Sequence, residues 1–206
     1  MKLHRADVKP DWLNVPVKNR SSIQKLAFVT SGVITPGNIA TIIGFVMVLI
    51  GLWLIAEQDY LTGLCLLAVG RSFDVLDGYL AELTATKSPL GEKLDAGFDK
   101  LGTFLTLVVF GVHQLAPWWV LVALALPHAV ISLIILRALS QRIVIHPSRI
   151  GKLSMATAWV GLVGLVAAKV VDAGSVGLLG PAAFTMLAAS IMLGCYAAFG
   201  YAWGRD

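Results

Sequence analysis

The chain has 206 residues, of which 57% are hydrophobic and only 14% are charged. Soluble domains carry roughly a quarter charged residues, so this chain cannot cover a water-facing surface. With two cysteines and a net charge of +4, it is neither a disulfide scaffold, nor a disordered chain, nor a soluble nucleic-acid-binding domain. The composition indicates an integral membrane protein.

Six stretches of the chain are long and apolar enough to cross a bilayer, which takes about 20 residues. They are residues 38–56, 60–83, 91–114, 117–139, 152–171 and 176–201. The breaks between them are short, so neighbouring helices must run antiparallel. The predicted fold is an all-α integral membrane protein, with six transmembrane helices in one bundle over residues 38–206.

An N-terminal segment, residues 1–37, precedes this membrane domain. Within residues 21–34 the apolar Ile23, Leu26 and Val29 are set against Gln24 and Lys25. This pattern predicts an amphipathic helix lying at the level of the lipid headgroups. The alternative is a solvated basic tail that only helps to set the topology. Either form would be attracted to anionic lipid.

Lysine and arginine decide the orientation of membrane helices, because cytoplasmic loops are enriched in them. The first 37 residues hold six, the break at residues 84–90 holds Lys87, and the break at residues 140–151 holds Arg142 and Arg149. The breaks on the opposite side hold none. We therefore expect an inner (cytoplasmic) membrane protein whose two termini and basic breaks face the cytoplasm.

Acidic residues occur where the second and third helices should cross the membrane. Asp74 and Asp77 are three residues apart, and Asp95 and Asp99 are four apart, so each pair shares one helix face. The short break between the two helices makes them an antiparallel hairpin, and the two faces can meet. Because a charged side chain deep in a bilayer costs at least ~2.5–3.5 kcal/mol, these aspartates must face a wet interior or bind cations.

Divalent cations are the natural partners for four crowded carboxylates, and Mg²⁺ or Mn²⁺ suits a site made of carboxylates and phosphates. Gly78 and Gly91 stand beside the aspartates, where small residues would admit a ligand; close helix packing is the alternative. For the aspartates themselves the alternative is a network of ion pairs with Arg71, Lys93 and Lys100. Those three cations cannot neutralise the six nearby acids, which include Glu82 and Glu92.

Residues 74–99 resemble the signature of the CDP-alcohol phosphotransferases (CDP-alcohol phosphatidyltransferases), D-x2-D-G-x2-A-R-x8-G-x3-D-x3-D. Seven of its eight fixed positions are present with the right spacing: Asp74, Asp77, Gly78, Ala81, Gly91, Asp95 and Asp99. The six-helix architecture also agrees with this family. The departure is Glu82, where the family has arginine. A subfamily variant, a mutation and a non-catalytic relative are the competing explanations, and Arg71, Lys87 and Lys93 are candidates for the missing charge.

Two weaker similarities extend the resemblance. Residues 35–41 are similar to the Thr-Pro-Asn-x-x-Thr segment that opens the first helix in many members, although a capped helix start explains them equally well. Residues 149–157 are similar to the Gly-Lys-x-Lys-Thr segment of the phosphatidylglycerophosphate synthases, with the second lysine missing. In that interpretation the acceptor's phosphate is held by the nearby cations, which otherwise are only positive-inside charges: Arg137, Arg142, Arg149 and Lys152.

The resemblance implies transfer of a phosphatidyl group from a CDP-alcohol, such as CDP-diacylglycerol, to an acceptor hydroxyl, with release of CMP. It implies two Mg²⁺ or Mn²⁺ ions held by Asp74, Asp77, Asp95 and Asp99, with Asp99 also the general base. The residues implied for the CDP group are Asp74, Asp77, Gly78, Ala81, Gly91, Asn38 and Thr41.

The acceptor favoured by the basic residues is phosphorylated, with glycerol 3-phosphate first and an inositol phosphate or a lipid next. The resemblance further implies an active site toward the cytoplasm, a membrane-lipid environment and a homodimer, with no nucleic-acid partner. Two interpretations from other classes remain: a cation pathway through the acidic cluster, and an inactive membrane scaffold.

Overall fold

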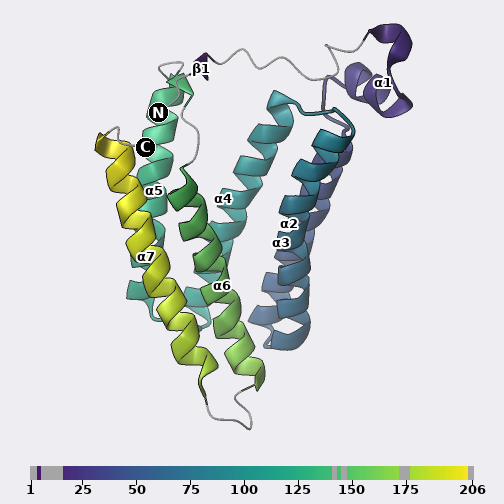
Figure 1. Cartoon of the computed structure of the whole chain (residues 1–206). Coiled ribbons are helices and arrows are strands. Elements are labelled where there is room, and N and C mark those ends of the chain that lie inside the picture. Colours follow the sequence, from purple (N-terminus) through teal and green to yellow (C-terminus); the bar gives the residue numbers. More distant parts are fainter. Residues whose placement is uncertain (1–3, 6–15, 141–142, 145–147, 172–176, 204–206) are drawn as a thin grey trace. The chain divides into compact units, whose positions relative to one another are not determined.

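The computed structural model describes residues 4–5, 16–140, 143–144, 148–171 and 177–203 (Figure 1). Across these residues the chain forms seven α-helices, one short 3-10 helix and one pairing of two-residue strands. Two compact units can be distinguished, and each is described by itself: Asp7–Thr106, here the N-terminal unit, and Leu107–Asp206 with Met1–Ala6, here the C-terminal unit. The all-α part of the predicted fold is confirmed.

The N-terminal unit begins its helices where a polar residue precedes an apolar run. The Thr35 hydroxyl accepts a hydrogen bond from the Asn38 N–H (3.1 Å), and the Ser88 hydroxyl accepts one from the Gly91 N–H (2.9 Å). Such caps satisfy backbone donors that have no partner within the helix. The elements are η2 (Val17–Asn19), α1 (Ser22–Val29), α2 (Pro36–Ala56), α3 (Tyr60–Leu83) and α4 (Pro89–Val112), whose last residues belong to the C-terminal unit.

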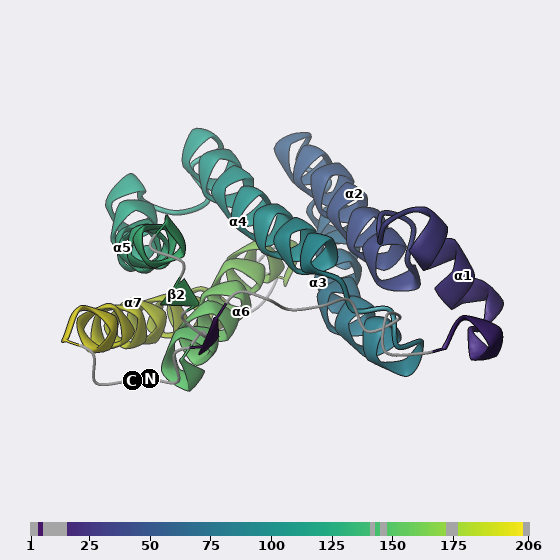
Figure 2. The same cartoon turned by 90° about the horizontal axis from the view of Figure 1, so that it is seen from above.

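Helices α2 and α3 pack directly on each other through glycines, and the view from above shows them side by side (Figure 2). A Cβ atom on Gly70 would lie 2.7 Å from the carbonyl oxygen of Gly44, and one on Gly51 would lie 2.9 Å from that of Gly63. No other residue permits so close an approach of two backbones. These contacts fix the register of α3, and with it the register of the aspartates, against α2.

The C-terminal unit contains three long helices whose tightest contact lies between α6 and α7. The Ser154 hydroxyl donates to the carbonyl oxygen of Ser190 (2.9 Å), and the Ser190 hydroxyl donates to that of Ser154 (2.7 Å). Both side chains are fully buried, so the reciprocal bonds satisfy their polar groups. The elements are β1 (His4–Arg5), α5 (Trp118–Ser140), β2 (Ile143–Val144), α6 (Arg149–Val171) and α7 (Leu179–Trp203), with β1 antiparallel to β2.

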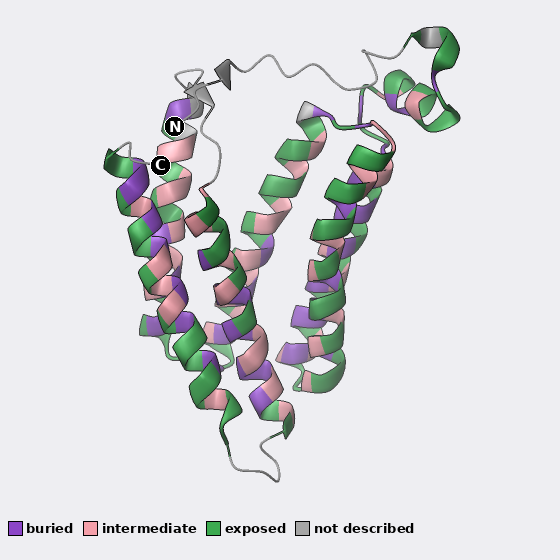
Figure 3. Ribbon diagram, viewed as in Figure 1, coloured by how far each residue is buried: buried purple, intermediate pink, exposed green. Residues whose placement is uncertain are grey.

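Among the described helices, four are long and apolar enough to cross a membrane: α2, α5 over Trp118–Ile135, α6 and α7. Large apolar side chains are exposed along them, such as Trp53 and Met192, as the exposed positions in Figure 3 illustrate. Helices α3 and α4 are equally long, at 24 residues each, but carry the motif charges. A helix is therefore present at each of the six predicted transmembrane segments, and four of these six helices are long and apolar enough to cross a membrane.

The helix boundaries differ from the predicted ones for local reasons. Helix α6 begins at Arg149 rather than at residue 152, because the Ser148 hydroxyl accepts a hydrogen bond from the Gly151 N–H (3.0 Å) and caps an earlier start. The amphipathic segment predicted over residues 21–34 is helical only over Ser22–Val29. Ser31 takes a φ of 52° there, and the Gly32 N–H bonds the carbonyl oxygen of Ala27 (2.8 Å), which ends the helix.

Candidate active site

Asp77 is the most buried of the four motif aspartates, with 5% of its surface exposed. The hydroxyl of Thr41, on α2, donates a hydrogen bond to its Oδ2 atom at 2.6 Å and also contacts the carbonyl oxygen of Gly37 at 3.0 Å. A carboxylate oxygen in so enclosed a place needs a donor. The partner helix therefore sets the direction in which Asp77 points.

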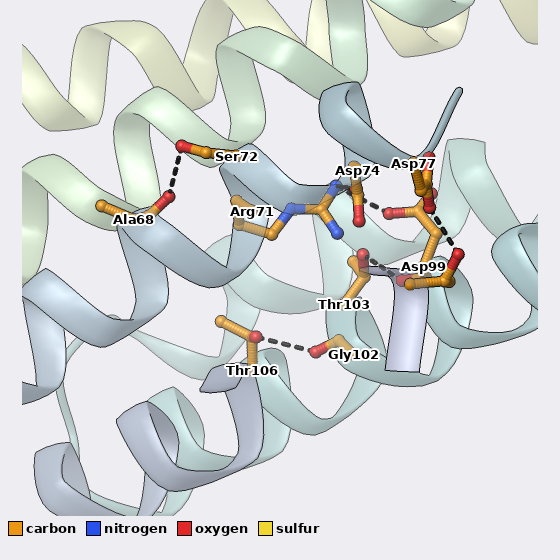
Figure 4. Close-up of polar contacts among 10 residues, drawn as sticks. Ala68, Arg71, Ser72, Asp74, Asp77, Asp99, Gly102, Thr103 and Thr106 are labelled. Carbon is orange, nitrogen blue, oxygen red and sulfur yellow. Dashed lines mark hydrogen bonds and ion pairs between the residues drawn. The ribbon is translucent and has the colours of Figure 1, made fainter. Parts of the chain in front are cut away.

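Arg71 joins the second and third long helices of the N-terminal unit. Its Nη2 atom lies 2.8 Å from Oδ2 of Asp74, on the next turn of α3, and 2.8 Å from Oδ1 of Asp99 on α4 (Figure 4). Within the described residues, the buried Asp99 Oδ1 atom accepts no hydrogen bond. Within the described residues this oxygen is therefore engaged by the ion pair with Arg71, which ties α4 to α3.

Asp95 lies on α4 one turn before Asp99 and is exposed. It is near enough to Asp77, Asp74 and Asp99 to experience the negative charge of each, as well as the positive charge of Arg71. The structure thus gathers the four motif aspartates into one region where α3 and α4 approach each other. We call these four residues, Asp74, Asp77, Asp95 and Asp99, the acidic cluster.

The small motif residues have different surroundings. A Cβ atom on Gly91 would lie 2.6 Å from Oδ1 of Asn38, and one on Gly37 would lie 3.2 Å from Cβ of Ala81. Packing between helices therefore accounts for the small residues at positions 91 and 81. Around Gly78 nothing lies within 4 Å of such a Cβ atom, so packing does not explain this glycine. Gly78 therefore leaves open space on the face of α3 that it shares with Asp74, one turn earlier.

Asn38 anchors the entry to α2. Its Nδ2 atom donates to the carbonyl oxygens of Gly32 (2.9 Å) and Val33 (3.0 Å). Thr35 caps the same helix, and Pro36 stands in its first turn. Residues 35–41 therefore form a capped helix start, as one of the two interpretations of this segment predicted. Of the residues predicted there for the CDP group, Thr41 contacts an aspartate of the acidic cluster and Asn38 packs against Gly91.

A small pocket of about 10 Å³, roughly the room for one water molecule, lies beside Arg71. Phe45 of α2 and Phe98 of α4 form one wall, stacked with ring centroids 4.5 Å apart. These two phenylalanines were not among the residues predicted for the site. The feature of the sequence that could have pointed to Phe98 is its position directly before Asp99. The pocket is lined by Thr41, Gly44, Phe45, Val48, Arg71, Asp74, Phe98 and Gly102.

Glu82, the departure from the family signature, lies on the last turn of α3 and is exposed. Its Oε1 atom pairs with Nζ of Lys87 at 2.6 Å. Of the three cations considered for the missing charge, Lys87 is therefore engaged by Glu82 itself. Arg71, by contrast, contacts two aspartates of the acidic cluster.

The residues predicted for the acceptor's phosphate belong to the C-terminal unit. Arg137 lies on the last turn of α5, and Arg149 and Lys152 lie on the first turn of α6. All three are exposed. Arg142 falls outside the described residues.

The acidic cluster has the donor chemistry of a site for a hard divalent cation, because it offers several carboxylates on two helices. Over the part of the chain that the structure describes, no three histidine, cysteine, aspartate or glutamate side chains are arranged as ready-made metal ligands. Arg71 already draws Asp74 and Asp99 toward itself. The aspartates therefore have the ligand chemistry that a divalent metal requires, but in this structure they do not have the geometry of a metal-binding site.

Known proteins that are similar to this chain belong to one family. The family model for CDP-alcohol phosphatidyltransferase matches residues 34–198, more than three quarters of the chain. An archaetidylinositol phosphate synthase from Pyrococcus horikoshii is 35% identical over 85 residues, which cover 41% of this chain and 45% of that protein. The chain thus matches less than half the length of this relative. By the family match, which includes every residue of the acidic cluster, the chain belongs to the CDP-alcohol phosphatidyltransferase family.

Proposed function

We propose that this protein transfers a phosphatidyl group from a CDP-alcohol, such as CDP-diacylglycerol, to the hydroxyl of an acceptor alcohol and releases CMP. The observation that carries the proposal is the meeting of Asp74 and Asp99 at Arg71, with Asp77 held by Thr41 one turn along α3 and open space at Gly78. Carboxylates from two neighbouring helices meet there as a phosphate-handling metal site requires.

In this proposal Asp74, Asp77, Asp95 and Asp99 would hold two Mg²⁺ or Mn²⁺ ions, whose positive charge would neutralise the donor's diphosphate and the leaving phosphate. The hydrogen bond from Thr41 keeps Asp77 aimed in one direction before substrate arrives. Gly78 lets the donor approach the backbone of α3 on the face that it shares with Asp74. The role of the close helix packing at Asn38, Ala81 and Gly91 is to hold α2, α3 and α4 near one another at the site.

We assign Asp99 the role of general base. Its carboxylate would accept the proton of the acceptor hydroxyl while that oxygen forms a bond to the phosphatidyl phosphorus. The bond between that phosphorus and the bridging oxygen of CMP breaks, and CMP leaves with the electron pair. The place of Asp99 at the end of the family signature supports this assignment, and so does its contact with Arg71, which brings α4 to the aspartates of α3.

The acceptor we propose is a phosphorylated alcohol. Arg149 and Lys152 on the first turn of α6, with Arg137 and Arg142, supply positive charge suited to such a phosphate. Glycerol 3-phosphate is the acceptor indicated by residues 149–157. Inositol phosphate is the second candidate, because the relative from Pyrococcus horikoshii is an archaetidylinositol phosphate synthase.

We further propose that all six long helices, α2 to α7, cross the membrane. Helices α3 and α4 each rise about 36 Å at 1.5 Å per residue, which is enough for a hydrocarbon core of about 30 Å. The acidic cluster would then lie toward the cytoplasm, where both termini also lie by the positive-inside rule. Exposed Ile23, Leu26 and Val29 on α1 support an interfacial role for that helix. A homodimer is the assembly we expect.

Lipid mass spectrometry after incubation of the purified protein with CDP-diacylglycerol and Mg²⁺ tests this proposal. The acceptor panel contains glycerol 3-phosphate, inositol 1-phosphate and phosphatidylglycerol, each added alone. We expect a phosphatidylated product with one of the two phosphorylated alcohols and none without acceptor. If phosphatidylglycerol is the single acceptor in the panel that yields a product, the proposal of a phosphorylated alcohol as acceptor is wrong. If no acceptor yields a product, a non-enzymatic protein is favoured. An Arg149→Gln, Lys152→Gln variant should raise the acceptor KM and leave the donor KM unchanged.

A further inference from the structure

We propose that Arg71 is an internal counter-ion of the acidic cluster, and that it competes with divalent metal for Asp74 and Asp99. The inference rests on the proposed function, because it concerns the metal that the cluster is proposed to hold. It assigns a positioning role to a residue outside the family signature, which begins at Asp74.

The geometry makes Arg71 the link between the two halves of the cluster. One atom, Nη2, lies 2.8 Å from a carboxylate oxygen on α3 and 2.8 Å from one on α4. The Arg71 side chain is 21% exposed and those of Asp74 and Asp99 are 31% and 28% exposed, so these contacts are partly shielded from water. The stack of Phe45 on Phe98 forms a wall of the pocket that contains Arg71, which limits where the guanidinium can move.

The charges explain why such a link is needed. Four ionised carboxylates in one region repel one another, and Arg71 is the cation that contacts two of them in the described structure. Without metal, Arg71 therefore holds α3 and α4 together at the site. The same contacts use the carboxylate oxygens that a metal would need, which explains why no ready-made ligand group is present among the described residues. Binding of metal must then release at least one of the two aspartates from Arg71.

The test is a titration of the purified full-length protein with Mn²⁺ alone, in which electron paramagnetic resonance measures the free ion. Arg71→Gln should bind Mn²⁺ about tenfold more tightly than the wild type, which corresponds to about 1.4 kcal/mol. Arg71→Lys should lie between the two, because an ammonium is a point charge and lacks the guanidinium's fork of donors. Lys100→Gln is the matched control: residue 100 follows Asp99 directly, is exposed and faces another way.

Lys100→Gln removes the same charge from the neighbourhood without removing the contact, so its Mn²⁺ affinity should stay near that of the wild type. If Arg71→Gln changes the affinity no more than Lys100→Gln does, or weakens it, the competition is refuted. A thermal-stability cycle with Arg71→Gln, Asp99→Asn and the double variant adds a second measurement. The coupling between the two residues should be present in EDTA and disappear in saturating Mn²⁺; coupling that persists in Mn²⁺ contradicts the inference.

The outcomes separate this inference from the proposed function. If the wild type releases CMP from CDP-diacylglycerol while Arg71→Gln leaves Mn²⁺ affinity unchanged, the inference alone fails. If no CMP is released but Arg71→Gln still binds Mn²⁺ more tightly than the wild type, the proposed transfer fails and the competition stands.

Discussion

The Thr41 hydroxyl on α2 and the Asp77 carboxylate on α3 form a 2.6 Å hydrogen bond that joins the two helices at the site. Both residues are buried, and glycines close to them bring the helix backbones together. The bond orients the most buried member of the acidic cluster. The first prediction follows from it.

Thr41→Val keeps the shape of the side chain and removes the donor. Asp77 Oδ2 then loses its hydrogen bond in an enclosed place, so we expect the free energy of unfolding to fall by about 1–3 kcal/mol. Unfolding by a denaturing detergent, followed by circular dichroism, measures this change. Thr41→Ser is the control, because it retains the hydroxyl. Equal stability of the two variants would show that the bond does not orient Asp77.

Gly78→Ala separates ligand approach from helix packing. Because a Cβ atom at position 78 meets nothing within 4 Å, the substitution should leave folding intact and stabilise α3 by up to about 1 kcal/mol. If the donor approaches the backbone here, the KM for CDP-diacylglycerol should rise severalfold. Gly97→Ala on α4 is the control, since its surroundings are equally open and it faces away from Asp95 and Asp99. The same donor KM in both variants would exclude Gly78 from the donor site.

Glu82→Arg restores the arginine of the family signature. Glu82 is exposed, and its ion pair in the described part of the chain is with Lys87 on the surface, so the melting temperature should not change. Donor affinity should be retained or improved, because a cation replaces an anion near a phosphate-binding site. Steady-state CMP release against CDP-diacylglycerol concentration measures both KM and kcat, with Glu82→Gln as the neutral control. A collapse of kcat in Glu82→Arg alone would mean that Glu82 has a function of its own.

Asp99→Asn removes the proposed base and keeps the shape of the side chain. We expect transfer to be lost, with kcat lowered by about 10²–10⁴-fold, while Mg²⁺-dependent binding of CDP falls much less, because three aspartates remain to hold metal. Isothermal titration with CDP measures the binding. Asp77→Asn is the comparison, since a metal ligand without a role as base should lose CDP binding together with transfer. Unchanged turnover in Asp99→Asn would remove Asp99 as the base.

Much of this fold could be predicted from the sequence. Helix α3, Tyr60–Leu83, has the bounds predicted for the second membrane helix, because the Asp59 side chain caps its start and the apolar run ends with it. The approach of the two aspartate pairs followed from helical spacing and from the short break between the helices. Local rules of this kind depend only on neighbouring residues.

Contacts between helices were harder to predict. The sequence offered Arg71 as a partner for Asp74, three residues away, but gave no sign that the same guanidinium reaches Asp99 on another helix. The stack of Phe45 on Phe98 was missed for the same reason. Each contact depends on the rotation of one helix about its own axis relative to the neighbouring helix. That rotation cannot be predicted from a single sequence. The pairing of His4–Arg5 with Ile143–Val144 had no signal in the sequence either.

Release of CMP from CDP-diacylglycerol by the purified protein in lipid vesicles tests the central claim most directly. The account predicts release that requires both a phosphorylated acceptor and Mg²⁺, stops in EDTA, returns when Mg²⁺ or Mn²⁺ is restored, and is absent in Asp77→Asn. Release that continues in EDTA or without acceptor, or that Asp77→Asn leaves unchanged, would contradict a metal-dependent transferase built on the acidic cluster.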